Sequence, residues 1–149
     1  MQAIDAVLID PVGCLAESPE ATIYEDVPPA LAELKSLGVK LVICSLLGEA
    51  VASRLIGRLA PAAFAGFFYG GNSLLRAVQA LDLDPARAMF LTATAEGLQA
   101  ARRAGVHGIL MMNDPDESRR LASHKPSGGI VSLHELPDFI RLLRARGVS

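Results

Sequence analysis

A carboxylate at the end of an apolar run is the first feature of this sequence that could carry chemistry. Four apolar residues, Ala6–Ile9, lead directly into Asp10, and a turn containing Gly13 follows. A continuous apolar run of this length is typical of a strand buried on both faces. The carboxyl ends of such strands, next to glycine-containing turns, are where open α/β sheets bind ligands. A second apolar run ends in the hydroxyl of Ser45. The pattern therefore predicts a site at one edge of a sheet.

The elements that must position this site alternate along the whole chain. Short apolar runs alternate with longer stretches of helical periodicity, which favours a parallel α/β sheet. We expect strands at residues 6–9, 40–45, 64–69, 88–91, 106–112 and 130–131, with 64–69 at an edge of the sheet. We expect six helices. The first opens at Pro28 and Pro29, the second covers 48–59, and the third carries Leu74, Leu75, Val78 and Leu81. The fourth covers 96–104, the fifth begins at Pro115, and the sixth covers 133–144 with a kink or restart at Pro137.

Composition narrows the class of protein. The chain has 149 residues, of which 51% are hydrophobic, with a mean hydropathy of +0.36 and a net charge of −2. No basic patch or long apolar run indicates a nucleic-acid or membrane partner. The amino terminus does not resemble a signal peptide, and two cysteines are too few for a disulfide framework. We therefore expect a cytoplasmic protein with reduced thiols.

The opening stretch resembles the first motif of the haloacid dehalogenase-like superfamily, four hydrophobic residues followed by D-x-D-G-T-L. Asp10, Gly13 and Leu15 fit this motif, whereas Val12 and Cys14 stand at the positions of its second Asp and its Thr. The order of the later segments is similar to that family over nearly the whole chain. The resemblance implies a Rossmann-like three-layer α/β/α sandwich with a mainly parallel central sheet and no cap domain, formed by residues 1–149 as a single domain.

The resemblance also implies roles for individual positions. In the superfamily's phosphatases the leading Asp, here Asp10, is a nucleophile that accepts the phosphoryl group. The second Asp is a general acid and base, and Val12 can perform neither role. A Ser or Thr after the second strand, here Ser45, binds a phosphoryl oxygen, and Gly13 belongs to the same anion-binding region.

Two further positions of the resemblance carry no matching group. A Lys is expected before or at the start of the helix preceding the fourth motif, and Arg76 is the nearest cation. The fourth motif, G-D-x-x-x-D, supplies carboxylates for Mg²⁺, but Ala93 and Gly97 stand at the two acidic positions. Glu96 is one residue out of step, about 100° away on a helix. We therefore expect no bound metal, and Mg²⁺ only if the protein is active, with Asp114 or Asp116 as substitute ligands.

Alternative interpretations remain open for several residues. Asp10 can be an inherited turn residue that accepts hydrogen bonds from the backbone of the Gly13 loop, and Ser45 a capping hydroxyl. Cys14 and Cys44 are expected to be buried thiols rather than a redox pair. Three histidines lack the spacing of a zinc site. The turn at residues 70–73 is a plain loop with a cap or a weak anion site.

Two functional hypotheses follow. The first is a catalytically degenerate domain with no Mg²⁺-dependent phosphatase activity that binds a partner protein, its own copies or a small anion. The second is a divergent hydrolase or phosphatase that uses Asp10 as its nucleophile. Capless relatives in the superfamily use large substrates or a neighbouring subunit, so the resemblance implies a homo-oligomer. An unrelated flavodoxin-like or receiver-like domain is disfavoured, because the paired acids and Lys of a receiver are also missing.

Overall fold

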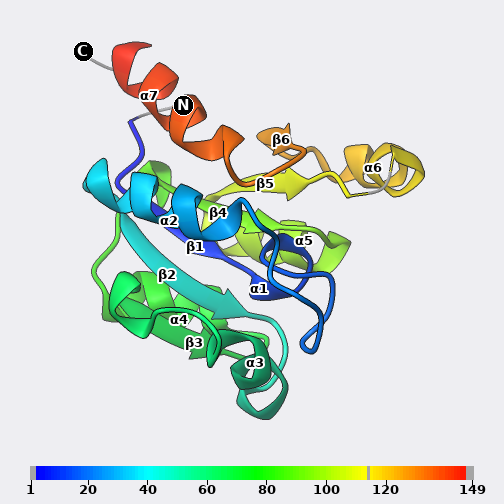
Figure 1. Cartoon of the computed structure of the whole chain (residues 1–149). Helices are drawn as coiled ribbons and strands as arrows, with labels where there is room; N and C mark the ends of the chain where they lie inside the picture. Colours follow the sequence, from blue (N-terminus) through cyan, green and yellow to red (C-terminus); the bar gives the residue numbers. More distant parts are fainter. Residues whose placement is uncertain (1–2, 114, 147–149) are drawn as a thin grey trace.

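A six-stranded parallel sheet forms the centre of the computed structural model, which describes residues 3–113 and 115–146 (Figure 1). The strand order is β3-β2-β1-β4-β5-β6. The strands are β1 (Ala6–Ile9), β2 (Lys40–Ser45), β3 (Gly66–Tyr69), β4 (Ala88–Thr92), β5 (His107–Met111) and β6 (Gly128–Ile130). Every strand pair is parallel, and β3 lies at an edge, so the predicted sheet is confirmed.

Helices cover both faces of this sheet. They are α1 (Pro11–Cys14), α2 (Val27–Ser36), α3 (Glu49–Ile56), α4 (Ser73–Ala80), α5 (Ala95–Ala104), α6 (Pro115–Leu121) and α7 (Glu135–Arg146), with short 3₁₀ turns η1 (Pro61–Ala63), η2 (Pro85–Arg87) and η3 (Ala122–His124). Helices α2 and α7 pack together on one face, and α4 and α5 pack together on the other (Figure 1). The three-layer α/β/α arrangement is therefore confirmed.

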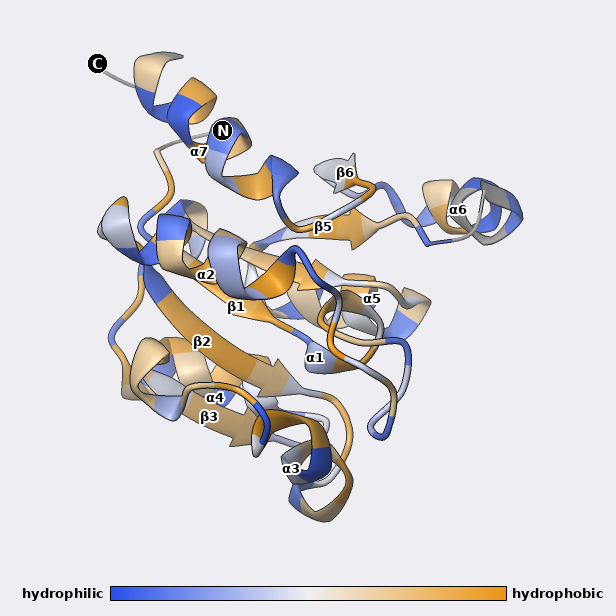
Figure 2. Ribbon diagram, in the orientation of Figure 1, coloured by the Kyte–Doolittle hydropathy of each residue, from blue (hydrophilic) through white to orange (hydrophobic). Residues whose placement is uncertain are grey.

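The core is split into two clusters by the sheet, because successive strand residues point to opposite faces. Val7 and Ile9 belong to the cluster beneath α2, α3 and α7, whereas Leu8 belongs to the cluster beneath α4 and α5. All four residues of β1 are buried, which places this strand in the middle of both clusters. Figure 2 shows the strands as the most hydrophobic part of the chain.

Some element boundaries differ from the sequence-based expectations. Helix α3 ends at Ile56 rather than at 59, and strand β3 begins at Gly66 rather than at 64. Leu75, one of the apolar residues that the predicted helix carries, is 40% exposed on α4. Pro137 does not interrupt α7, because it lies in the first turn, where a missing N–H has no intrahelical acceptor.

The order of the strands fixes where a site can form. The chain passes from β1 to β2 on one side and returns to β4 on the other, so the connections diverge at β1. In open α/β sheets the crevice at this switch point, outside the carboxyl ends of the strands, is where ligands bind. The ends of β1, β2 and β4 carry Asp10, Ser45 and Thr92 respectively.

Packing of α2 provides a test of the fold. Leu34 is fully buried on the inner face of α2, so Leu34→Ala is expected to lower the free energy of unfolding by about 2–5 kcal/mol. Leu75→Ala, at an exposed helical position, should change it by less than about 1 kcal/mol. Urea unfolding of both variants measures the difference, and equal losses would contradict the structure.

Candidate functional site

Asp10 lies at the carboxyl end of the central strand. Its backbone N–H donates to the carbonyl of Leu91 at 2.9 Å, which extends the β1–β4 ladder by one residue. The residue is only 5% exposed, so the carboxyl group is held within the sheet edge rather than presented to solvent. The sequence therefore placed Asp10 correctly at the end of a buried strand.

The side-chain partner of Asp10 is Thr92, the last residue of β4. The Thr92 hydroxyl, itself fully buried, donates to Asp10 Oδ2 at 3.4 Å. This separation is long for a hydroxyl–carboxylate hydrogen bond, so the bond is weak. Thr94 follows and caps α5, because its hydroxyl accepts from the N–H of Gly97 at 3.0 Å.

Burial dominates the electrostatics of Asp10. It raises the pKa of this carboxyl from 3.8 to about 7, and the bond from Thr92 opposes the shift without cancelling it. Near neutral pH a large fraction of the Asp10 carboxyl groups is therefore protonated. A protonated carboxyl group is a poor nucleophile and a poor ligand for a cation.

Hydrogen bonds within the turn after Asp10, and one from Asn113, hold this turn in place. Gly13 has a φ of +97°, which favours glycine, and its N–H donates to the carbonyl of Ala16 at 2.7 Å. The Gly13 carbonyl accepts from the side-chain amide of Asn113 at 2.8 Å. The predicted hydrogen bonds from this loop to Asp10 are therefore not formed, because the Gly13 amide is directed to Ala16 and Asp10 makes no side-chain cap.

Small side chains fill the positions where the resemblance places metal carboxylates. A Cβ added to Gly13 would lie 2.9 Å from Cβ of Ala93, so the Ala93 methyl group packs against the turn. A Cβ added to Gly97 would overlap the Thr92 hydroxyl and lie 2.8 Å from the Thr92 methyl carbon. Thr92 thus occupies space that is open only because residue 97 is glycine. Glu96 is exposed.

The donor set does not fit Mg²⁺, which prefers several oxygen ligands in octahedral geometry. The site offers one carboxyl group with a raised pKa and the Thr92 hydroxyl. Within residues 3–113 and 115–146, no three His, Cys, Asp or Glu side chains are grouped to hold a metal ion. Of the expected substitutes, Asp114 lies outside the described residues, and Asp116 is exposed and pairs with Arg119 at 3.7 Å.

Ser45, the predicted phosphate ligand, and Arg76, the nearest cation, each form a hydrogen bond with a backbone group nearby in the sequence. Ser45 is fully buried, and its hydroxyl accepts from the N–H of Leu47 at 3.1 Å, as a capping hydroxyl does. The exposed guanidinium of Arg76 donates to the carbonyl of Tyr69. Ser73 is the first residue of α4, and its buried hydroxyl has no partner among the described residues.

The two cysteines are separate buried thiols, as expected. Cys14 packs in the cluster on the α2 face and Cys44 in the cluster on the α4 face, so the sheet lies between them. Burial raises the pKa of both thiols, with a further contribution from Asp10. Neither thiol is activated as a nucleophile.

Thr92 and Asn113 are the site residues that sequence reasoning missed. Thr92 ends the strand that returns next to β1, so the alternation of elements places its hydroxyl beside Asp10. The glycine five positions later, Gly97, was the signal that this hydroxyl has room. Asn113 follows β5, two strands from β1, and the sequence carries no sign of its contact with Gly13.

Comparison with known proteins identifies a family. The family model described as haloacid dehalogenase-like hydrolase matches residues 2–105. No curated protein matches the chain. A haloacid dehalogenase-like hydrolase from Streptococcus pneumoniae superposes with a TM-score of 0.72 at 19% identity, covering 81% of this chain and 61% of that chain.

Two other solved structures match over nearly their whole length. A haloacid dehalogenase-like protein of unknown function from Agrobacterium tumefaciens has a TM-score of 0.77 at 16% identity, covering 94% of this chain and 99% of that chain. The cobalt-bound deoxy-D-mannose-octulosonate 8-phosphate phosphatase from Haemophilus influenzae has a TM-score of 0.75 at 12% identity, covering 97% and 91%. By contrast, the chain spans about three fifths of the Streptococcus protein and 59% of a Bacteroides fragilis relative. At these identities the structures establish a shared fold.

A membrane-spanning helix is not found in the part of the chain that the structure describes.

The raised pKa of Asp10 predicts a specific dependence of stability on pH. The folded state binds this proton more tightly than the unfolded state does. The contribution of Asp10 to the free energy of unfolding is therefore fully present below about pH 4 and is lost as the pH rises through about 7. Three pKa units correspond to about 4 kcal/mol. Asp10→Asn should therefore match the wild type near pH 4 and exceed its free energy of unfolding by up to about 4 kcal/mol at pH 8, measured by urea unfolding. A less stable Asn variant at pH 8 would mean that the carboxylate is ionised and compensated.

The packing of Thr92 against Gly97 predicts coupled substitutions. Gly97→Ala should lower the free energy of unfolding by about 1–3 kcal/mol, because the added methyl group overlaps Thr92. In the background of Thr92→Gly the same change should cost little, giving a coupling energy of about 1–3 kcal/mol in a double-mutant cycle. Gly71→Ala is the matched control, since a Cβ there meets nothing within 4 Å. Additive effects at 92 and 97 would refute the packing argument.

Proposed function

Because the chain belongs to the haloacid dehalogenase-like hydrolase family, we propose that it is a member that lacks Mg²⁺-dependent phosphatase activity and acts as a binding or oligomerisation module. Its ligands would be its own copies, a partner protein or a small anion at the former catalytic edge. Hydrolases of this family typically use Mg²⁺. Whether this chain has side chains that can hold the ion therefore decides whether phosphatase activity is expected.

One observation carries this proposal: Asp10 is buried with a hydroxyl, not a cation site, as its neighbour. Among the described residues, no cationic side chain pairs with this carboxyl group. Ala93 and Gly97 provide no oxygen ligands where the resemblance expects carboxylates. A phosphate ester brought to this site would meet no cationic side chain beside Asp10 among the described residues to offset its negative charge.

Proton transfer is a second deficit. Cleaving a phosphate ester through an aspartyl-phosphate requires an acid for the leaving oxygen and a base for the attacking water. Val12, two residues after Asp10, has an aliphatic side chain that can neither donate nor accept a proton. General acid–base catalysis is worth about 10²–10⁴-fold in rate, so its loss adds to the loss of the metal ligands.

The scaffold around the site is nevertheless retained, which supports a binding role. The turn at Gly13 keeps its left-handed conformation, and Asn113 anchors it to the end of β5. Between Asp10 and Ser45 the chain holds a loop and α2, and between Ser45 and Gly71 it holds α3, η1 and β3. These intervals leave no room for an inserted cap, so we include a capless architecture and a homo-oligomer in the proposal.

The alternative is a divergent hydrolase with Asp10 as nucleophile. The observation that favours it is the placement of Asp10 and Ser45 at the carboxyl ends of adjacent strands β1 and β2. A pKa of about 7 also leaves part of the Asp10 population ionised at neutral pH. This hypothesis requires that residues other than 93 and 97 hold a cation beside Asp10.

Turnover measurements separate the two hypotheses. A panel of phosphate monoesters with millimolar Mg²⁺ should give the wild type no turnover above that of Asp10→Asn, because the metal ligands and the acid are missing. The purified chain should also elute in a sizing measurement above its monomer mass of 15.7 kDa. Phosphatase activity that disappears in Asp10→Asn would overturn the main proposal and establish the alternative.

A further inference from the structure

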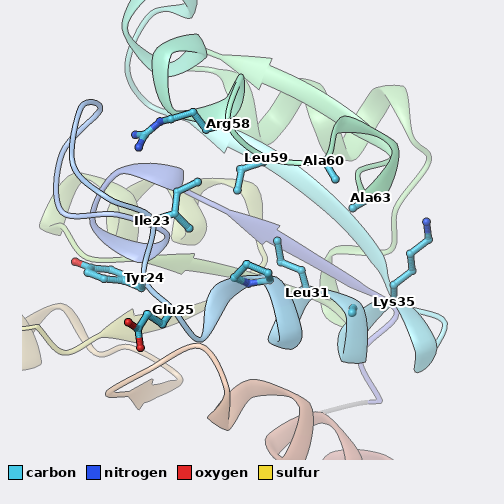
Figure 3. A pocket seen from close by; sticks show the side chains of 11 residues that line it. Ile23, Tyr24, Glu25, Leu31, Lys35, Arg58, Leu59, Ala60 and Ala63 are labelled. Atoms are coloured by element: carbon cyan, nitrogen blue, oxygen red, sulfur yellow. The ribbon is translucent and has the colours of Figure 1, made fainter.

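An apolar groove of about 510 Å³ lies beside α2 (Figure 3), and none of Asp10, Ser45 and Thr92 lines it. It is formed by α2, the loop before α2 and the segment after α3. Ile23, Leu31, Leu59 and Ala63 are among the apolar residues that line it. Its volume falls in the range of roughly 300–1,000 Å³ that is typical of small-molecule sites, which are mostly apolar with a few polar groups.

The charged residues of the groove are arranged asymmetrically. Lys35 lies at one end and Glu25 at the other, as Figure 3 shows. Lys35 is exposed, and its ammonium group donates to the carbonyl of Ala62 at 3.4 Å, a long contact with a neutral acceptor. No ion pair of Lys35 is found among residues 3–113 and 115–146. Its positive charge is therefore available to a ligand.

Arg58, the other cation of the groove, is committed to the protein. Its guanidinium donates to the carbonyls of Ala21 at 2.6 Å and Pro19 at 2.7 Å, and its Nε donates to that of Arg54 at 3.4 Å. These bonds join the end of α3 to the loop before α2. Arg58 thus forms the wall of the groove, while Lys35 remains the group that can bind an anionic head.

We propose that this groove binds a small amphiphile with an anionic carboxylate head and an unbranched apolar tail. The head lies at Lys35, and the tail runs over Leu31 and Leu59 toward Ile23. Glu25 disfavours the reverse orientation, because it would face the carboxylate at the other end. The groove volume lies within the range of roughly 300–1,000 Å³ for small-molecule sites, so a small amphiphile such as dodecanoate is a suitable probe.

The length of the groove favours a small molecule over a helix of a partner protein. Along α2 the lining extends from Pro28 to Lys35, about 10 Å at the rise of an α-helix. A partner helix would need a longer apolar face than this to place anchors over several turns. The proposal is independent of the proposed function, because the groove shares no residue with the Asp10 site.

Titration of the full chain with dodecanoate below its micelle concentration tests the proposal. NMR signals of Ile23, Leu59 and Ala63 are expected to shift in a saturable manner. Lys35→Glu should weaken binding by at least about tenfold, because it removes a charge-assisted bond and adds repulsion. Lys40→Glu makes the same charge change at an exposed residue outside the groove and should alter affinity less than twofold.

Several results would overturn the proposal. Equal binding of dodecanol or dodecyltrimethylammonium would show that the head group is not recognised, and equal affinity in Lys35→Glu would show that Lys35 is not the contact. Shifts of the groove signals with protein concentration alone would mean that a second copy fills it. Asp10→Asn should bind dodecanoate like the wild type, so the outcome does not depend on phosphatase activity.

Discussion

Burying a carboxyl group costs free energy unless a charge or several hydrogen bonds compensate, and this constraint governs the carboxyl edge of the sheet. The backbone bond that continues the β1–β4 ladder fixes the main chain of Asp10 at this edge, where the residue is buried. One weak bond from Thr92 is its only described side-chain compensation. Burial without a compensating charge favours the neutral form of this carboxyl group, as its raised pKa reflects.

The residues around Asp10 are packed closely against one another. The methyl group of Ala93 packs against the Gly13 turn, and the Thr92 side chain fills the space above Gly97. Both are close contacts of an apolar or hydroxyl group, so the edge is packed without gaps at these positions. The edge is thus packed as a small extension of the core, and α5 can sit directly against the end of β4 because residue 97 has no side chain.

Much of the fold could be predicted from the sequence, because apolar runs and helical periods are local signals. The runs at Ala6–Ile9 and Lys40–Ser45 gave strands with the observed bounds, and the edge position of the aromatic strand was also correct. Some helix and strand boundaries were predicted wrongly. The apolar periodicity continues to Leu59, but α3 ends before Gly57, and short-range turns follow it. At the site, position along the chain placed Asp10 and Ser45, but hydrogen-bond partners were not predictable. The directions of the Gly13 amide and the Asn113 side chain depend on contacts between residues distant in sequence.

The interlocked side chains at 92 and 97 also limit which sequences this edge accepts. A side chain cannot be introduced at 97 while Thr92 keeps its present position, since the first atom of that side chain would collide with Thr92. Glycine at 92 would remove the collision but would leave a void at the end of β4. We therefore expect the two positions to vary together among related sequences, so that a change at one is tolerated only alongside a change at the other.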